Sequence, residues 1–221
     1  MWPRRINRTS ESHLEEDDVK LIDQEQAPNP RRVRIFLAEK GITVPTEQVN
    51  LINLEHRSAE FTALNPLQQV PILILDDGTA ISESVAICRY FEEQQPDPPL
   101  FGRTAMERVL VEMWQRRMEL ALLFRVAQCF RHSHPAMAEL EKPQIKEWAE
   151  ANRPRVLTLL SWLDRELAGR RYIAGDDYTI ADITALVAID FMKRARIDRP
   201  TDLKNLARWY EEVSSRPSAK A

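Results

Sequence analysis

A proline-rich segment divides the chain into two parts with different residue periodicity. Residues 95–102 contain three prolines and end in Gly102, a composition typical of a linker between domains. Before this segment, short β-prone runs alternate with helical patterns. After it, apolar residues recur only at helical spacing, most clearly in the ranges 106–130, 146–168, 180–194 and 203–213. The sequence therefore predicts an α/β domain followed by an all-α domain.

The order of elements in the first part predicts its fold. Gly41 lies at the expected end of a helix, where a residue with a left-handed backbone conformation is needed. Asp76-Asp77-Gly78 is a strong signal for a hairpin turn. The expected elements are a strand at 19–22, a helix at 31–40, a strand at 46–51, a helix at 59–64, strands at 72–75 and 79–81, and a helix at 82–94. This β-α-β-α-β-β-α order is that of a thioredoxin-like domain, and the second part is expected to be a helical bundle.

We expect the domain boundaries to follow the same division. The thioredoxin-like domain should span residues 18–95, the linker 96–103 and the all-helical domain 104–221. Residues 1–17 contain a twin arginine followed by acidic residues, with no apolar segment that would make them an export signal. We interpret them as a disordered leader.

The charge and the cysteine content exclude several functional classes. The chain has 221 residues and a formal net charge of −3, which creates no field to attract nucleic acid or an anionic membrane. No run approaches the about 20 apolar residues that span a bilayer. Cys88 and Cys129 lie in helical patterns without a Cys-x-x-Cys spacing, and His132 and His134 have no metal-ligand spacing. We expect a cytoplasmic protein with no metal and no nucleic-acid or membrane partner.

Three short segments have a chemical interpretation. Val70-Pro71 precedes a buried strand, and because proline has no N–H to donate to a ladder, a tight turn should expose the backbone of Val70. The alternative is a simple strand-entry proline. Ser82-Glu83-Ser84 opens a helix, whose free N–H groups can hold a carboxylate, although an N-cap with an acid in the first turn is the alternative. Thr179-Ile180-Ala181-Asp182 has the pattern of a capping box and is expected to serve folding.

These segments, in this order, resemble the soluble glutathione transferases, and the resemblance covers nearly all of residues 19–221. It implies that the bond before Pro71 is cis, that the backbone of Val70 pairs with the cysteinyl part of glutathione, and that Glu83 and Ser84 hold the γ-glutamyl end. His56 and Arg57 stand where relatives place a basic contact to the glycyl carboxylate, unless they are simply solvated charges. The expected glutathione-binding residues are Gln69, Val70, Pro71, Glu83, Ser84 and His56.

The loop before the first helix departs from the better-known members. Its sequence is Ala-Pro-Asn-Pro, and Ala27 occupies the position that holds Ser or Cys in many classes, as in a bacterial type without the usual Tyr, Ser or Cys. Free glutathione should titrate near the cysteine value of about 8.5, so catalysis requires stabilisation of its thiolate. We expect Asn29 to be the catalytic residue, assisted by the N-terminus of a helix beginning near Pro30 and by Arg31. The alternative is that Asn29 only satisfies the loop backbone.

The resemblance leaves two classes of function open. The first is a glutathione-binding enzyme that conjugates glutathione to a small electrophile or uses it to reduce disulfides or peroxides. The second is a non-catalytic binding or regulatory module with the same fold. Glutathione would be the co-substrate, with a small-molecule acceptor near Trp114, Arg117 and Met118, although a tryptophan at such a position more often belongs to the core. The resemblance also implies a homodimer in which residues 84–91 face the long helix of the partner.

Overall fold

The computed structural model describes residues 19–221, so the leader expected at residues 1–17 lies outside the described residues. The first part of the chain has the predicted order of elements. They are β1 (Lys20–Asp23), α1 (Pro28–Lys40), β2 (Thr46–Gln48), a 3-10 turn η1 (Glu55–Arg57), α2 (Ala59–Leu64), β3 (Ile72–Ile74), β4 (Ala80–Ser82) and α3 (Ser84–Gln94). The thioredoxin-like fold of this part is thereby confirmed.

The second part of the described chain is helical. Its elements are α4 (Ala105–Arg116), a π-helical segment η2 (Arg117–Leu123), α5 (Phe124–Arg131), α6 (Lys146–Glu166), α7 (Ile180–Met192) and α8 (Lys204–Ser214), with 3-10 turns η3 (Pro135–Met137), η4 (Leu167–Gly169) and η5 (Pro217–Lys220). The single long helix expected over 106–130 is thus three successive segments with a π-helical centre. No helix in residues 19–221 is long and apolar enough to cross a membrane.

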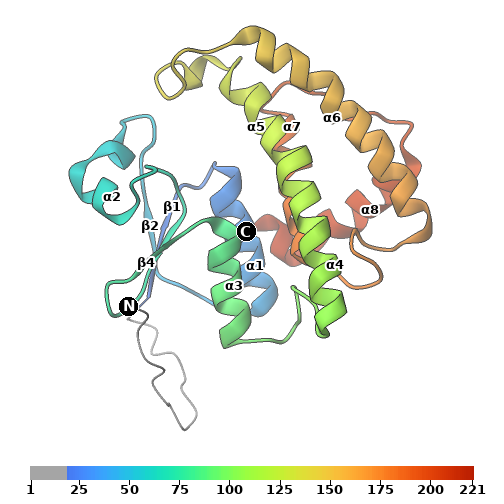
Figure 1. Cartoon of the computed structure of the whole chain (residues 1–221), viewed down its shortest axis with the longest axis horizontal. Helices are drawn as coiled ribbons and strands as arrows, with labels where there is room; N and C mark the ends of the chain where they lie inside the picture. The colour runs from blue at the N-terminus through green and yellow to red at the C-terminus, as the bar shows by residue number, and fades with distance from the viewer. Residues whose placement is uncertain (1–18) are drawn as a thin grey trace, which may run out of the picture.

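The sheet has four strands in the order β2-β1-β3-β4. β1 pairs parallel with β2, and β3 runs antiparallel to both β1 and β4. Side chains alternate across this sheet as the strand period requires. Leu21 and Leu73 face the large core, whereas Ile22 and Ile72 form a smaller cluster with Phe61 of α2. The sheet is therefore covered by α1 and α3 on one face and by α2 on the other (Figure 1).

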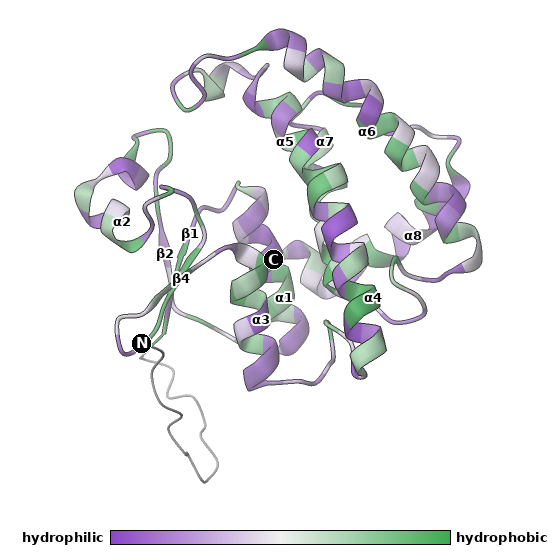
Figure 2. Cartoon of the chain, viewed as in Figure 1, coloured by the Kyte–Doolittle hydropathy of each residue, from purple (hydrophilic) through white to green (hydrophobic). Residues whose placement is uncertain are grey.

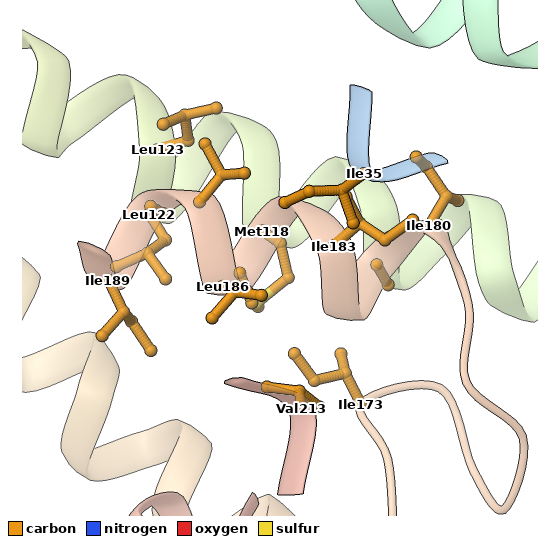
Figure 3. Close-up of a cluster of buried hydrophobic side chains, with 14 of the residues drawn as sticks. Ile35, Met118, Leu122, Leu123, Ile173, Ile180, Ile183, Leu186, Ile189 and Val213 are labelled. Atoms are coloured by element: carbon orange, nitrogen blue, oxygen red, sulfur yellow. The ribbon is translucent and has the colours of Figure 1, made fainter. Parts of the chain in front are cut away.

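The large core continues from the sheet into the helical part. Ile35 of α1 is completely buried and lies near Ile180 and Ile183 of α7, while Met118 and Leu122 approach α7 from the η2 segment (Figure 3). α7 is apolar nearly all round, which is the pattern of a central helix. The outer helices α4 and α6, in contrast, carry both apolar and polar residues (Figure 2). Because one core joins both parts, the two cannot move apart without exposing apolar surface.

The capping box predicted at the start of α7 is confirmed. The backbone N–H of Thr179 donates to the carboxylate of Asp182 at 2.9 Å, and the Thr179 side chain caps the first turn. Asp182 is completely buried and also accepts from the indole N–H of Trp209 at 2.8 Å and the backbone N–H of Ile173 at 2.9 Å. This carboxylate therefore ties α7 to α8 and to the preceding loop.

Several boundaries differ from the sequence expectation, and three of them adjoin the segments with a chemical interpretation. α1 begins at Pro28 rather than at residue 31, because proline is well accommodated in the first turn of a helix. The strand expected over 46–51 ends at Gln48. α3 begins at Ser84 because Ser82 pairs with Ile72 in the sheet. The first difference matters most, since it places Asn29 inside the helix.

Candidate functional site

The register of the sheet brings three sequence-predicted segments to one end of the first part. Ile72 pairs with Ile22 of β1 on one side and with Ser82 of β4 on the other. The chain enters β3 through Val70-Pro71, leaves β4 into Glu83-Ser84, and leaves β1 into the loop that starts α1. These three segments are therefore neighbours, although up to 57 positions separate them in sequence (84 minus 27).

The first turn of α1 has few backbone N–H groups that could bind a ligand. Ala27 is the N-cap and makes no side-chain capping bond, and Pro28 occupies the first helical position. Neither Pro28 nor Pro30 has an N–H, and the N–H of Arg31 already bonds to Ala27 at 3.2 Å. In this turn only Asn29 has both an N–H without an intrahelical partner and a polar side chain, and it is exposed.

The segment before β3 is held by a buried asparagine. Asn65 is 4 % exposed; its side chain donates to the carbonyl of Gln69 at 2.9 Å and accepts from the N–H of Leu67 at 3.0 Å. The Val70-Pro71 bond is cis, as the resemblance implied. Neither the N–H nor the C=O of Val70 bonds to another backbone group within residues 19–221. These two groups are therefore free to pair with an extended peptide.

The start of α3 has an unusual backbone. Glu83 is the N-cap with φ 68° and ψ 112°, a combination that side-chain-bearing residues rarely adopt. Such conformations cost about 1–3 kcal/mol and concentrate at functional sites. Glu83 is exposed, whereas the adjacent Ser84 is 4 % exposed. The turn thus presents an acidic side chain and the first N–H groups of a helix at the same place.

A buried arginine that the sequence reasoning missed connects these helices. Arg32 of α1 is 0 % exposed, and its guanidinium donates to the hydroxyl of Ser84 at 3.1 Å and to the carboxylate of Glu119 at 2.7 Å. A signal was present, because Arg32 lies four residues before the buried Phe36 and so falls on the buried face of α1. Asn29 lies one turn earlier in the same helix and is exposed.

His56 is buried rather than solvated. It is 7 % exposed, stacks edge-on against Phe61 with ring centroids 6.4 Å apart, and its Nδ1 has no hydrogen-bond partner within residues 19–221. Burial, with a smaller effect of Arg57, lowers the pKa of His56, so the ring is neutral at pH 7. Arg57 is exposed and donates to the carbonyl of Glu139 at 3.3 Å, which links η1 to the loop after α5.

Two of the three residues expected near the acceptor are buried. Trp114 is 4 % exposed and stacks on Trp162 of α6, with ring centroids 5.4 Å apart. Arg117 lies over the Trp114 ring at 4.7 Å, and Met118 is completely buried beside α7 (Figure 3). Trp114 and Met118 are therefore packed in the core, whereas Arg117 is exposed.

An open pocket instead adjoins the Ala27 loop. Its volume is about 280 Å³, and it is lined by residues of the loop, of α1 and of the end of α7: Glu25, Gln26, Ala27, Pro28, Arg31, Val187, Asp190, Phe191 and Arg194. Arg31 pairs with Asp190 at 2.7 Å, and Arg194 donates to the side chain of Gln26 at 3.2 Å. The pocket therefore combines apolar side chains with charged groups of both signs.

Neither cysteine belongs to this site. Cys88 and Cys129 are both completely buried, and burial raises the pKa of both thiols. A protonated and inaccessible thiol does not act as a nucleophile. Within residues 19–221, no group of three or more His, Cys, Asp or Glu side chains is arranged to hold a metal ion.

Comparison with known proteins identifies the relatives of this chain. Residues 27–94 match the model of the glutathione S-transferase N-terminal domain, and residues 114–217 match that of the C-terminal domain. Glutathione S-transferase 2 of Saccharomyces cerevisiae is 37 % identical over 203 residues, which cover 90 % of this chain and 87 % of the yeast protein.

Solved structures agree with the sequence comparison. A glutathione S-transferase domain-containing protein of Marinobacter aquaeolei VT8 superimposes with a TM-score of 0.87 at 38 % identity, covering 90 % of this chain and 98 % of the other. Gtt2 from Saccharomyces cerevisiae also gives a TM-score of 0.87, at 37 % identity, covering 91 % and 98 % of the two chains.

Proposed function

The chain belongs to the glutathione S-transferase family and is a glutathione-dependent transferase, and we propose that Asn29 stabilises the thiolate of its glutathione. The observation that carries this proposal is the composition of the first turn of α1. Ala27 has no hydroxyl or thiol, and the two prolines beside Asn29 provide no N–H. Asn29 can offer two donors to one sulfur, its backbone N–H and its side-chain amide. The positive end of the α1 dipole adds to their effect.

Glutathione itself is proposed to lie across the three neighbouring segments. Its cysteinyl backbone pairs with Val70 before Pro71, next to Gln69. Its γ-glutamyl ammonium faces the exposed Glu83, and its carboxylate meets Ser84 and the free N–H groups that begin α3. A neutral His56 would contact the glycyl end as a hydrogen-bond donor and not as a charge.

The acceptor is proposed to enter the pocket beside Ala27. This pocket adjoins the turn that carries Asn29, so an electrophile there would be close to the sulfur. The apolar side chains of Val187 and Phe191 suit a small apolar molecule. Because no cysteine reaches the site, reduction of a disulfide would require the bound glutathione thiolate to attack a substrate sulfur, whose partner sulfur leaves as a thiolate. No enzyme-glutathione disulfide is formed on this route.

We also propose that the protein is a cytoplasmic homodimer. An apolar stripe supports the dimer: Met106, Val109, Leu110 and Met113 of α4 are all at least 36 % exposed in the monomer. Their spacing of three or four residues puts them on one face of the helix. Exposed apolar surface of this kind is typical of a protein interface.

The role of Asn29 can be tested by titrating the thiol of bound glutathione. Thiolate absorbance should show that Asn29→Ala raises the thiol pKa by about one to two units, because a hydrogen bond to a charged group contributes about 1.5–3 kcal/mol. Asn29 is exposed, so the variant should keep its fold. Asn53→Ala, which changes another exposed asparagine of the same domain, should leave the pKa at the wild-type value. An unchanged thiol pKa in Asn29→Ala would remove Asn29 from the mechanism.

A further inference from the structure

A run of basic residues follows α7, beside the pocket that adjoins Ala27. Four of the seven residues from 193 to 199 are basic, and one, Asp198, is acidic. The four basic side chains are exposed, and none of them pairs with a carboxylate of residues 19–221, whereas the nearby Arg31 pairs with Asp190. We call this segment the basic turn; its cations are Lys193, Arg194, Arg196 and Arg199.

The backbone of the basic turn is fixed by several contacts. Ala195 and Ile197, which alternate with its basic residues, are 1 % and 7 % exposed. Arg153 of α6 donates to the carbonyl of Ala195 at 2.9 Å and to the carbonyl of Arg196 at 2.8 Å. Arg196 itself has φ 54°, in the left-handed region that side-chain-bearing residues seldom adopt. The cations are therefore presented by an ordered backbone.

The ion pair inside the pocket is already complete. Arg31 and Asp190 both line the pocket and pair at 2.7 Å. The other oxygen of Asp190 accepts from the hydroxyl of Tyr210 at 2.6 Å, and Arg31 also donates to the carbonyl of Ala219 at 3.0 Å. A ligand would have to break these contacts in order to use either charge.

Arg194 is a lining cation that remains available to a ligand. Its guanidinium donates to the neutral side chain of Gln26 at 3.2 Å and meets no carboxylate of residues 19–221. A guanidinium has five N–H donors, and its planar fork matches a carboxylate. Phe191 and Val187, three and seven residues before Arg194, line the same pocket. The pocket thus offers an unpaired cation next to apolar side chains.

We propose that the acceptor is a small electrophile with an apolar body and one anionic group, and that Arg194 binds this group. The inference rests on the proposed acceptor pocket beside Ala27. The apolar body would lie against Val187 and Phe191. The exposed carboxylate of Glu25, which lines the pocket from the loop, would repel the anionic group and direct it to Arg194. The basic turn would raise the local concentration of such a molecule, since unpaired cations beside a cleft attract anions.

The test compares 4-chloro-3-nitrobenzoate with 4-chloro-3-nitrobenzamide, which has nearly the same shape but no charge. In both reactions the glutathione thiolate attacks the carbon that bears chlorine; the C–S bond forms, the C–Cl bond breaks, and chloride leaves with the bonding electron pair. At saturating glutathione, kcat/KM for each compound is divided by its uncatalysed rate constant. The resulting value for the benzoate should exceed that for the benzamide about tenfold, the effect of one charge-assisted hydrogen bond.

Three variants assign this preference to the pocket. Arg194→Gln should abolish the preference for the benzoate, and Arg194→Lys should keep part of it, because lysine retains the charge. Glu25→Gln should increase the preference, because it removes the repelling carboxylate. If Arg194 only held Gln26, its loss would slow both reactions equally and leave the ratio unchanged. Arg165→Gln is the matched control: it removes an exposed arginine from the last turn of α6 and should keep the wild-type ratio.

Ionic strength tests the attraction by the basic turn as a whole. Between about 0.01 M and about 0.1 M salt the Debye length falls from about 30 Å to about 10 Å, so exposed charges act over a shorter range. The value of kcat/KM should fall several-fold for the benzoate and stay constant for the benzamide. Arg196→Gln, which removes a cation of the basic turn that does not line the pocket, should weaken this salt dependence.

The outcomes separate the two proposals. If neither compound reacts faster than in free solution, the proposed acceptor pocket and this inference both fail. If the benzamide is conjugated but the benzoate is not preferred, the acceptor is not selected by charge, and the inference fails while the transferase function stands. A preference that survives Arg194→Gln, or a benzoate reaction that does not respond to salt, would overturn the inference in the same way.

Discussion

Ala27 is the residue whose identity most affects the first turn of α1. It has the extended backbone of an ordinary N-cap, with φ −82° and ψ 140°, but no side-chain oxygen to accept an N–H. At an N-cap, Ser would accept from the second or third helical residue. The third is Pro30, so Asn29 is the remaining donor. The absence of a capping side chain therefore leaves the Asn29 N–H available to a ligand.

Ala27→Ser is expected to stabilise the protein. The new hydroxyl should cap the Asn29 N–H and raise the free energy of unfolding by about 1 kcal/mol, measured by urea denaturation followed by circular dichroism. Ala38→Ser, at an exposed interior position of the same helix, should instead lower it by a few tenths, about the difference in helix propensity. Equal destabilisation by both substitutions would show that the Asn29 N–H is not available for capping.

At the scale of elements, the sequence patterns of strands and helices were sufficient to predict the fold. They were not sufficient to predict which helices contact one another. Asp76-Asp77-Gly78 and Gly41 correctly located a hairpin and a helix end, because their backbone demands are local. Met118, which was expected near the acceptor, is completely buried. Apolar periodicity identifies the buried side of a helix but not the neighbour that covers it, and here α6 and α7 cover it.

The site residues show the same difference between local motifs and contacts that are distant in sequence. Val70-Pro71 and Glu83-Ser84 belong to short motifs, so the sequence alone singled them out, although their roles stay proposals. Arg32 was missed because its partners, Ser84 and Glu119, lie 52 and 87 positions away. A charged residue on the apolar face of a predicted helix is the local signal that could have indicated it.

The capping box of α7 predicts a specific pH dependence of stability. Burial raises the pKa of Asp182 to about 6, although Ile173, Trp209 and Thr179 donate to the carboxylate and oppose the shift. The unfolded carboxyl titrates near 3.8. Between these values the folded state holds more protons than the unfolded state, so this residue's contribution to stability falls as pH rises from about 4 to about 6.

Asp182→Asn isolates that contribution because asparagine does not titrate. The free energy of unfolding of the wild type minus that of the variant should decrease between pH 4 and pH 6 and stay constant above pH 7. Urea denaturation at each pH measures both proteins. The variant should still fold less stably at pH 7, since its amide group would face donors from Thr179 and Trp209. A difference that grows with pH would contradict a raised pKa.

At the scale of the whole molecule, one core and several polar contacts hold the two parts in a fixed arrangement. Lys40 at the end of α1 is buried, pairs with Glu92 at 2.6 Å and donates to the carbonyl of Gln95 at the start of the linker at 2.8 Å. At the other end of the junction, Arg32 of α1 pairs with Glu119 of η2 at 2.7 Å, so ion pairs join the two parts at both places. The apolar stripe along α4 stays exposed in this arrangement.

The stripe predicts how the protein associates. In a symmetric dimer, a charge introduced into the interface of one subunit faces the same charge on the other subunit. Leu110→Glu should therefore convert a dimer into the 25.7 kDa monomer without loss of helix content. Light scattering gives the mass and circular dichroism the helix content. Leu110 is 42 % exposed and Leu157 on α6 is 37 % exposed, so Leu157→Glu is a control of nearly equal exposure and should stay dimeric. A Leu110→Glu protein that remains dimeric would place the interface elsewhere, and a monomeric wild type would exclude the dimer altogether.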